Sequence, residues 1–434
     1  MVSHRVRRRR RQVAAAGGLV FMLLLYLLIF SGGGQKNPSP PSTSGPQPSE
    51  AFPAHSPLNP DWRGDGRSVT LGFGGDVHFA GAVATSLAQN PATALGATFG
   101  QLFAGARLRM VNVESSVTDG TCPEPQNKPY IFDAPATAIT ALRNATVTVA
   151  TEANDHGMDC GSQGLSQNLA IAASTKFPII GIGNDAAQAF APYRIRINGQ
   201  RIAVIAATQV IADNLVSTWS ATATQPGVAS ALNPTLLVRA VQRARRTSDT
   251  VVVYLHWGTE TQACPNPAQE PLAEQLVRAG ADIVIGADAH VLLGGGYLGS
   301  SYVDYGLGNF AFYDNTAPET SGGSLILTVV GRSITSATFR PATVLAGLPQ
   351  PLSGAPAANA LQTWDAARNC TNLAATPYTS LASERGETSS FIAPATTATT
   401  TSTTTSAGSV SPTSSSTTTT TIPPTTTTPT DNAG

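Results

Sequence analysis

Short polar motifs that directly follow apolar runs restrict the fold of this chain more than any other feature. The first, Gly74-Gly75-Asp76-Val77-His78, follows residues 69–73, which have the composition of a β-strand. Its glycines permit a tight turn and the close approach of a ligand. An Asp and a His two positions apart at the end of a strand can therefore both face one cation.

Four further motifs of this kind follow along the chain. They are Asn112-Val113-Glu114, Asn154-Asp155-His156, His256-Trp257-Gly258 and the stretch 286–290, which ends in His290. Together with the first motif they contain four of the six histidines. Ligands of open α/β sheets bind at the carboxyl ends of strands, so we expect all of these motifs to meet at one edge. Taken singly, each motif is equally compatible with ordinary polar residues at a strand end.

The body of the chain alternates strand-like and helix-like segments. Strands are expected at 68–74, 107–113, 146–150, 178–182, 201–207, 250–255, 281–286 and 301–305. Helices are expected at 134–143, with Pro135 in the first turn, and at 164–175, 234–246 and 271–279. Asn198-Gly199 predicts a hairpin, and Gly331-Arg332 predicts a second one. This pattern indicates a layered α/β domain with mixed strand directions.

The two ends of the chain differ from the body in composition. Residues 1–12 form a basic tail, and residues 13–30 form an apolar run long enough for a minimal membrane span. Arginines before the run predict a single-pass signal anchor with the body outside the cytoplasm; a cleaved signal peptide is the alternative. Residues 31–66 read as a Pro/Ser/Gly-rich linker, and 67–391 as the folded domain. Residues 392–434, rich in Thr, Ser and Pro, are expected to form a disordered stalk, glycosylated or bare.

Charge and cysteine content fit an exported protein. Six of the 26 basic residues lie between positions 5 and 11, so the body is mildly acidic and is not a nucleic-acid surface. Disulfides are typical of exported proteins, and four cysteines allow three pairings. We favour Cys122 with Cys160 and Cys264 with Cys370, because residues 122 and 160 should lie in neighbouring loops.

The residue types of the motifs suggest a metal site. Carboxylate oxygens combined with imidazole nitrogens suit Mn, Fe or Zn better than Ca. The candidates exceed what one tetrahedral ion needs, so we expect two divalent ions. Two ions roughly 3.5–4 Å apart can hold a phosphoryl group and activate a water.

Several of these stretches also resemble a known family. Besides the motifs above, they include Gly280-Ala281-Asp282-Ile283, His290-Val291 and Tyr305-Gly306-Leu307-Gly308-Asn309-Phe310. Between about residues 68 and 345 the chain resembles the CapA family of bacterial capsule or poly-γ-glutamate synthesis proteins. That resemblance implies a fold like the calcineurin-like metallophosphatases, an αββα sandwich with mixed sheets.

The resemblance also implies roles for individual residues. Asp76 and His78 would hold one metal, Glu114 would bridge, and Asn154 with His256 would hold the second. His156 would donate a proton or steady a phosphoryl oxygen, and His290 would complete the site. Asp288 stands where the family usually has a His, and Asp155 where it usually has an Asn. The candidates for the substrate cleft are Asn112, Glu260 and Asn309.

Three functions follow as hypotheses. The first is an exported, membrane-anchored, metal-dependent hydrolase-like component of capsule or poly-γ-glutamate synthesis, acting on an anionic polymer within a synthase or export complex. The second, motivated by Asp288, is a scaffold that kept the fold and lost the chemistry. The third, suggested only by the Thr-rich tail, is a surface adhesion protein.

Overall fold

A computed structural model describes residues 65–313 and 316–378 of the protein. The predicted basic tail, the anchor at 13–30, nearly all of the linker and the tail at 392–434 lie outside these residues. Within the described ranges, no helix combines the length and apolar character needed to cross a membrane. The predictions for the two ends therefore stay predictions.

The first of two large sheets has eight strands. Seven of them run in the order β18-β17-β16-β1-β2-β5-β6, and β15 pairs with β1. The strands β1, β2, β5, β6 and β15 pair in parallel, whereas β16, β17 and β18 form an antiparallel extension. The bounds are β1 (Val69–Val77), β2 (Leu108–Val113), β5 (Val149–Thr151), β6 (Ile179–Ile180), β15 (Asn309–Ala311), β16 (Ser321–Val330), β17 (Ser333–Leu345) and β18 (Leu348–Pro351).

The second sheet has six strands in the order β13-β14-β12-β11-β9-β8. Its four central strands are parallel, and an antiparallel strand lies at each edge. The bounds are β8 (Tyr193–Ile197), β9 (Gln200–Thr208), β11 (Thr250–Trp257), β12 (Ile283–Asp288), β13 (Gly295–Leu298) and β14 (Ser301–Asp304). Two short pairs complete the strands: β3 (Ser116–Thr118) with β4 (Asp133–Pro135), and β7 (Ile182–Gly183) with β10 (Gly227–Val228).

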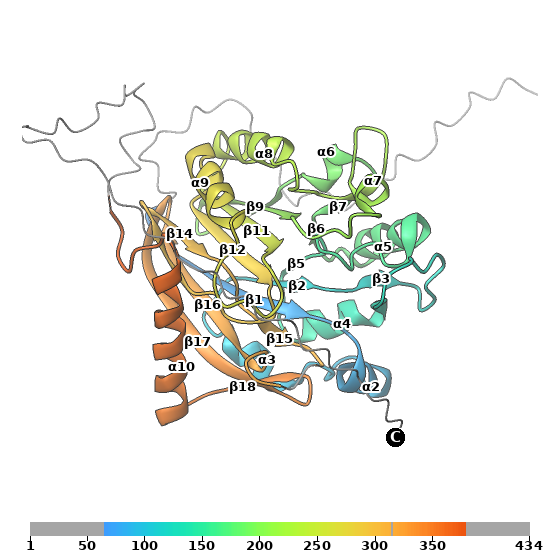
Figure 1. The fold of residues 1–434 in the computed structure, drawn as a ribbon, viewed down its shortest axis with the longest axis horizontal. Coiled ribbons are helices and arrows are strands. Elements are labelled where there is room, and N and C mark those ends of the chain that lie inside the picture. The colour runs from blue at the N-terminus through green and yellow to red at the C-terminus, as the bar shows by residue number, and fades with distance from the viewer. Residues whose placement is uncertain (1–64, 314–315, 379–434) are drawn as a thin grey trace, which may run out of the picture. The chain divides into compact units, whose positions relative to one another are not determined.

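Helices cover the outer faces of both sheets (Figure 1). The first sheet packs against α2 (Gly81–Gln89), α3 (Gly96–Leu102), α4 (Thr137–Asn144) and α5 (Gly161–Thr175). The second sheet packs against α8 (Thr235–Arg245) and α9 (Gln269–Ala279). The remaining helices are α6 (Ala186–Ala189), α7 (Val216–Trp219), α10 (Gly354–Ala367) and the 3-10 turn η1 (Arg368–Cys370). Of these, α10 packs against β17.

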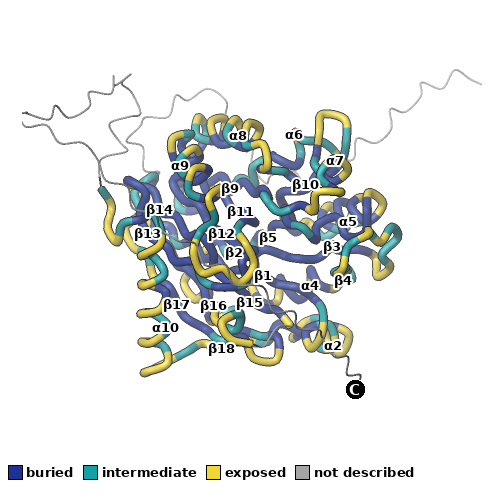
Figure 2. The backbone as a smooth tube through the Cα atoms, in the orientation of Figure 1, coloured by how far each residue is buried: buried dark blue, intermediate teal, exposed yellow. Residues whose placement is uncertain are grey.

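The strand β11 shows why the chain forms four layers. Successive side chains of a strand point to opposite faces of the sheet. Val251 and Val253 accordingly join the core beneath α8 and α9, whereas Val252 and Tyr254 join the core between the two sheets. Both faces of the strand are buried along its whole length, which explains its continuous apolar run, and β11 is dark blue in Figure 2. The layers are therefore helix, sheet, sheet, helix.

Most of the predicted elements are present, with two local differences. Pro135 does not begin a helix, because residues Asp133–Pro135 pair with β3 and α4 starts only at Thr137. The run 178–182 is divided into β6 and β7 at Gly181, whose φ is 85°. Both predicted hairpins are confirmed, as β8–β9 and β16–β17. Both predicted disulfides, Cys122–Cys160 and Cys264–Cys370, are also confirmed.

Candidate metal centre

The polar motifs meet where strands of both sheets end. In the first sheet, Asp76 near the end of β1 lies in register with Asn112 of β2. In the second sheet, His256 and Asp288 lie at the ends of the neighbouring strands β11 and β12. The prediction of one shared edge was wrong in this respect: the two layers each contribute their carboxyl ends. Within the first sheet, Gly75 permits the residue before β15 to lie against β1, because a β-carbon at Gly75 would overlap the carbonyl oxygen of Gly308.

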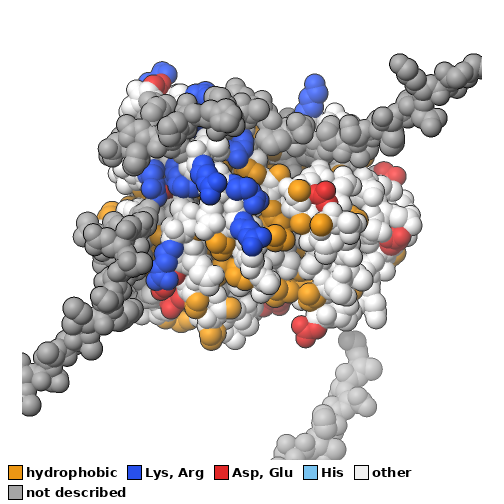
Figure 3. Space-filling model, turned by 90° about the horizontal axis from the view of Figure 1, so that it is seen from above, with side chains coloured by type: hydrophobic (Ala, Val, Ile, Leu, Met, Phe, Trp, Pro, Cys, Tyr) orange, Lys and Arg blue, Asp and Glu red, His pale blue; other side chains and the backbone are white. Residues whose placement is uncertain are grey.

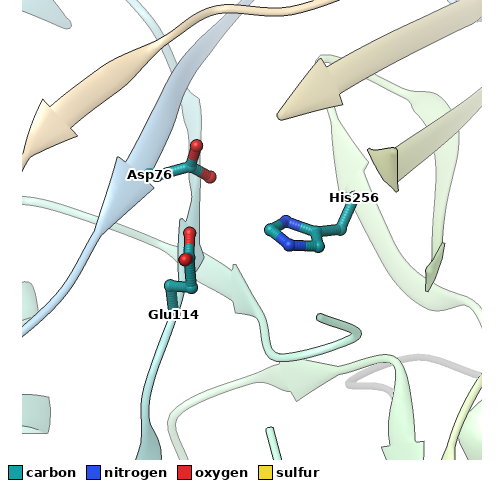
Figure 4. A group of neighbouring side chains, drawn as sticks. All are labelled: Asp76, Glu114 and His256. Atoms are coloured by element: carbon teal, nitrogen blue, oxygen red, sulfur yellow. The ribbon is translucent and has the colours of Figure 1, made fainter. Parts of the chain in front are cut away.

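Three overlapping groups of side chains could each hold a metal ion. They are Asp76, Glu114 and His256; Glu114, Asp155 and His156; and Asp155, His256 and Asp288. In each group, one ligand atom per residue lies within 4.8 Å of the others. Figure 4 shows the first group, with the two carboxylates on one side and the imidazole ring opposite them.

Asp76 connects the two sheets. Its Oδ1 accepts a hydrogen bond from Asn112 Nδ2 (2.8 Å), and its Oδ2 accepts one from the backbone N–H of Asp288 (3.1 Å). The side chain is fully buried, and this burial raises its pKa. Asp76 is thus held in place from both layers before any ion binds.

Glu114 follows β2 and is nearly as buried as Asp76. Burial, together with the negative charge of Asp76, raises its pKa well above the usual range for a carboxyl group. Its Oε2 has no hydrogen-bond partner among the residues that the structure describes. A buried carboxylate oxygen without a partner is costly, and a bound cation would satisfy it.

His256 is held between carboxylates. Its Nε2 lies 3.1 Å from Asp155 Oδ1 and 3.0 Å from Asp288 Oδ1. On the other side of the ring, Nδ1 lies 3.2 Å from Asn112 Nδ2. Burial alone would lower the pKa of His256, but Asp288 and Asp155 raise it well above its usual value. Asp288 therefore points into the site in place of the histidine expected from the resemblance.

Asp155, the residue after the predicted ligand Asn154, also faces the site. The amide nitrogen of Asn154 donates to Asn112 Oδ1 and to the carbonyl of Val113, and its oxygen accepts from the backbone N–H of His156. These contacts hold the loop, and the amide oxygen keeps a second lone pair, so Asn154 as a metal ligand stays a prediction. Asp155 belongs to two of the three metal-binding groups. Burial raises the pKa of this carboxyl, but His156, His256 and Lys128 outweigh it and hold the pKa below the usual value.

The predicted proton donor His156 is held by Asp159 and Lys128, two residues that sequence reasoning missed. Asp159 Oδ2 lies 2.6 Å from His156 Nδ1 and accepts a hydrogen bond from the backbone N–H of Phe132 (2.7 Å). Lys128 Nζ lies 3.1 Å from Asp159 Oδ1 and 3.3 Å from Asp155 Oδ2. The spacing of His156 and Asp159, one helical turn, was a usable signal. No local pattern marked Lys128, which comes from a distant loop.

His78 and His290 lie at the margin of the cluster. His78 Nε2 accepts a hydrogen bond from the backbone N–H of Tyr313 (2.8 Å), and burial lowers the pKa of His78 to about 3. Its Nδ1 has no partner among the described residues. His290 Nδ1 lies 3.7 Å from Asp76 Oδ2, and His290 Nε2 lies 3.9 Å from Glu114 Oε1. Neither histidine belongs to a three-residue group within the described chain.

The structure separates the three predicted cleft residues. Asn112 and Asn309 are buried at the centre, where Asn309 Oδ1 lies 2.9 Å from His290 Nδ1. Glu260 is exposed and has no contact with the cluster among the interactions that the structure records for the described residues. Asp288 and His290 have positive φ values of 102° and 57°, conformations that are strained outside glycine and that concentrate at functional sites.

The donor set fits divalent metal ions. Four carboxylates converge on two imidazoles, and one oxygen of Glu114 is buried without a partner among the described residues. Lys128, paired with Asp155, offsets part of the negative charge of these carboxylates. A dication bound here would compensate the remaining charge and accept the oxygen and nitrogen donors that Mn, Fe and Zn prefer.

These observations define a class: an α/β protein of two packed sheets with a carboxylate- and histidine-rich candidate metal centre at the strand ends. A family match is more specific. Residues 70–314 match the family described as bacterial capsule synthesis protein PGA_cap. Because the match covers more than half of the chain, the protein belongs to this family, and the resemblance seen in its motifs is confirmed.

Individual relatives agree with the family. The chain is 31% identical over 202 residues to the PGA biosynthesis protein CapA of Bacillus subtilis, covering 46% of this chain and 52% of the relative. It is 33% identical over 178 residues to the capsule biosynthesis protein CapA of Bacillus anthracis, covering 40% and 42%. A probable polyglutamine synthesis accessory protein of Mycobacterium tuberculosis is 25% identical over 188 residues, covering 42% and 49%. The chain thus spans about half the length of these relatives.

Solved structures give weaker matches. A hypothetical protein from Thermus thermophilus superposes with a TM-score of 0.41 at 12% identity, covering 64% of this chain and 100% of that one. A phosphatase from Mycoplasma pneumoniae superposes with a TM-score of 0.40 at 14% identity, covering 64% and 94%.

Proposed function

We propose that this protein is an exported, membrane-anchored component of capsule or poly-γ-glutamate synthesis that acts as a metal-dependent hydrolase. Membership of the capsule synthesis family supports the process. One observation supports the chemistry: carboxylates and imidazoles from both sheets converge within 4.8 Å of one another in overlapping groups. The apolar run at 13–30, with the arginines before it, supports the anchor.

The residues have distinct tasks in this proposal. Asp76, Glu114, Asp155, His256 and Asp288 would hold the ions, which when bound would polarise the scissile group and lower the pKa of a water. His156 would carry a proton at Nε2 toward the leaving group. The contact of Asp159 with Nδ1 supports this role, because it orients the ring so that Nε2 faces Glu114 and Asp155.

Elemental analysis of the purified full-length chain tests the proposal. The same sample is assayed on a generic phosphodiester and on poly-γ-glutamate. We expect bound divalent metal, together with hydrolysis that disappears in Asp76→Ala and persists in the exposed control Glu260→Ala. A wild-type chain that holds no metal and hydrolyses neither compound would contradict the hydrolase assignment and favour the scaffold.

A further inference from the structure

The exposed face of α8 carries arginines that have no partner among the residues that the structure describes. Arg239, Arg243 and Arg246 are all exposed, and none makes an ion pair or side-chain hydrogen bond with a described residue. They are spaced four and three residues apart, which places them on one side of the helix. No acidic residue lies in α8 to compensate them. Interaction with the helix dipole can account for Arg243 and Arg246 near the end, but not for Arg239.

The neighbouring strand β8 extends this basic surface. Arg194 donates hydrogen bonds from Nη1 to Thr247 Oγ1 (2.9 Å) and Ser248 Oγ (3.2 Å), directly after α8. The next outward-facing residue, Arg196, is exposed. Figure 3 shows Lys and Arg side chains gathered on this side of the molecule. We call the exposed sides of α8 and β8 the α8 face.

Two large apolar side chains lie on the same face. Leu232 and Leu236 are 48% and 42% exposed; Leu232 lies just before α8, and Leu236 lies in its first turn, ahead of the arginines. The opposite side of α8 packs Leu237, Val241 and other buried residues onto the second sheet, so the exposed leucines take no part in the core. Exposed leucines beside a row of arginines are typical of helices that lie on a membrane surface.

The chain enters the domain beside this face. Asn198 Nδ2, in the turn that follows β8, donates a hydrogen bond to the carbonyl of Ser68 (2.8 Å), and Asp65 lies next to Gly199. The apolar run at 13–30 precedes this point by 34 residues (31–64). A flexible segment of that length has a root-mean-square span of about 30–35 Å, comparable to the width of a domain. The proposed anchor would therefore keep this end of the domain near the bilayer.

From these observations we propose that the α8 face docks on anionic phospholipid headgroups. The inference rests on the membrane anchor in the proposed function. Each arginine near an anionic surface strengthens binding by about fivefold at moderate ionic strength, and high salt removes the effect. Docking would also orient the metal centre. Val69 begins β1 near the entry point, and Asp76 lies seven residues further on, so the centre lies about 23 Å from that end.

Crosslinking of the full-length chain to lipid tests this inference. The chain is reconstituted into vesicles of phosphatidylcholine, alone or with phosphatidylglycerol, with a photoreactive amino acid in place of Leu236. A matched probe replaces Leu345, which is 66% exposed at the end of β17 in the other sheet. We expect lipid adducts from position 236 only with phosphatidylglycerol and low salt, and few adducts from position 345.

Charge variants provide the second measurement. Arg239→Gln with Arg243→Gln should lower the docking equilibrium about 30-fold. The control, Arg143→Gln with Lys176→Gln, removes the same charge from exposed positions on the other side of the two sheets and should change docking by less than about threefold. Unchanged circular dichroism and metal content verify that both variants fold.

The outcomes separate the inference from its premise. If alkaline carbonate washes the wild-type chain from the vesicles, the anchor and the inference both fail. If the chain stays anchored but position 236 gives no more adduct than position 345, only the docking face fails. If Arg239 and Arg243 instead bind soluble poly-γ-glutamate and no lipid, the face belongs to a polymer and the inference is overturned.

Discussion

Replacing Asp155 by Asn is the sharpest test of the candidate metal centre. The change keeps the shape of the side chain and an oxygen donor but removes one negative charge from two of the three metal-binding groups. A unit charge about 4 Å from another is worth about 4 kcal/mol at an effective dielectric constant of 20, and a dication gains about twice that. Lys128, 3.3 Å from Asp155 Oδ2, must give up the same carboxylate, which offsets about half of this gain. The net loss is about 4 kcal/mol, close to a thousandfold in Kd.

Isothermal titration of the metal-free chain with Mn²⁺ measures this effect directly. Glu260→Gln is the matched control, because it makes the same chemical change at an exposed carboxylate outside the cluster. We expect Glu260→Gln to bind as the wild type does. If the Kd of Asp155→Asn for Mn²⁺ lies within about threefold of the wild-type value, the charge argument is refuted. Even if the energy above is too large by a factor of two, the expected change in Kd is still about 30-fold.

Three further predictions follow from other contacts. Asp288→His should raise affinity for Zn²⁺ relative to Mn²⁺ by about tenfold, because imidazole favours zinc; an unchanged ratio of the two Kd values would show that residue 288 is not a ligand. Burial raises the pKa of Asp304 to about 7. Ionising this buried carboxyl lowers the free energy of unfolding; the loss is absent below pH 4, grows as the pH rises to about 7, and then stays constant. The free energy of unfolding of Asp304→Asn should therefore exceed that of the wild type by up to about 4 kcal/mol at pH 8 and by little at pH 4. Urea unfolding at both pH values measures this difference, and an equal difference at the two values would contradict the prediction. The Cys264–Cys370 bridge closes a loop of 106 residues, so replacing both cysteines with Ser should lower the free energy of unfolding by up to about 5 kcal/mol. Urea unfolding measures this change, and a midpoint equal to that of the wild type would contradict the prediction.

The sequence identified most strands because their cause is local. Runs such as residues 250–255 are continuously apolar, since both faces of β11 are covered, and this composition can be read without knowledge of the neighbours. Asn198-Gly199 fixes its hairpin in the same way, because both residues accept the positive φ values, 50° and 71°, that the turn requires. The edge helix α10 and the short pair β3–β4 were not found, since their existence depends on the surface against which they pack.

The site shows the same division. Asp76, Glu114, His256 and Asp288 could be named from the sequence because each lies at the end of a recognisable strand or directly after it. The part played by Asp155 could not be found there. Only its contacts with Lys128 and His256, which come from distant parts of the chain, show that its side chain faces the site.

By itself, the sequence determined the layered α/β class, the family and most of the motif residues, because strand patterns and short motifs are local properties. It could only favour the cysteine pairing that the structure confirms. The tertiary structure decided how those motifs combine. It placed the ligands on two sheets, brought Lys128 and Asp159 to His156, and gathered arginines from α8 and β8 on one face. These relations join residues far apart in the chain, and they depend on packing geometry that no local pattern encodes.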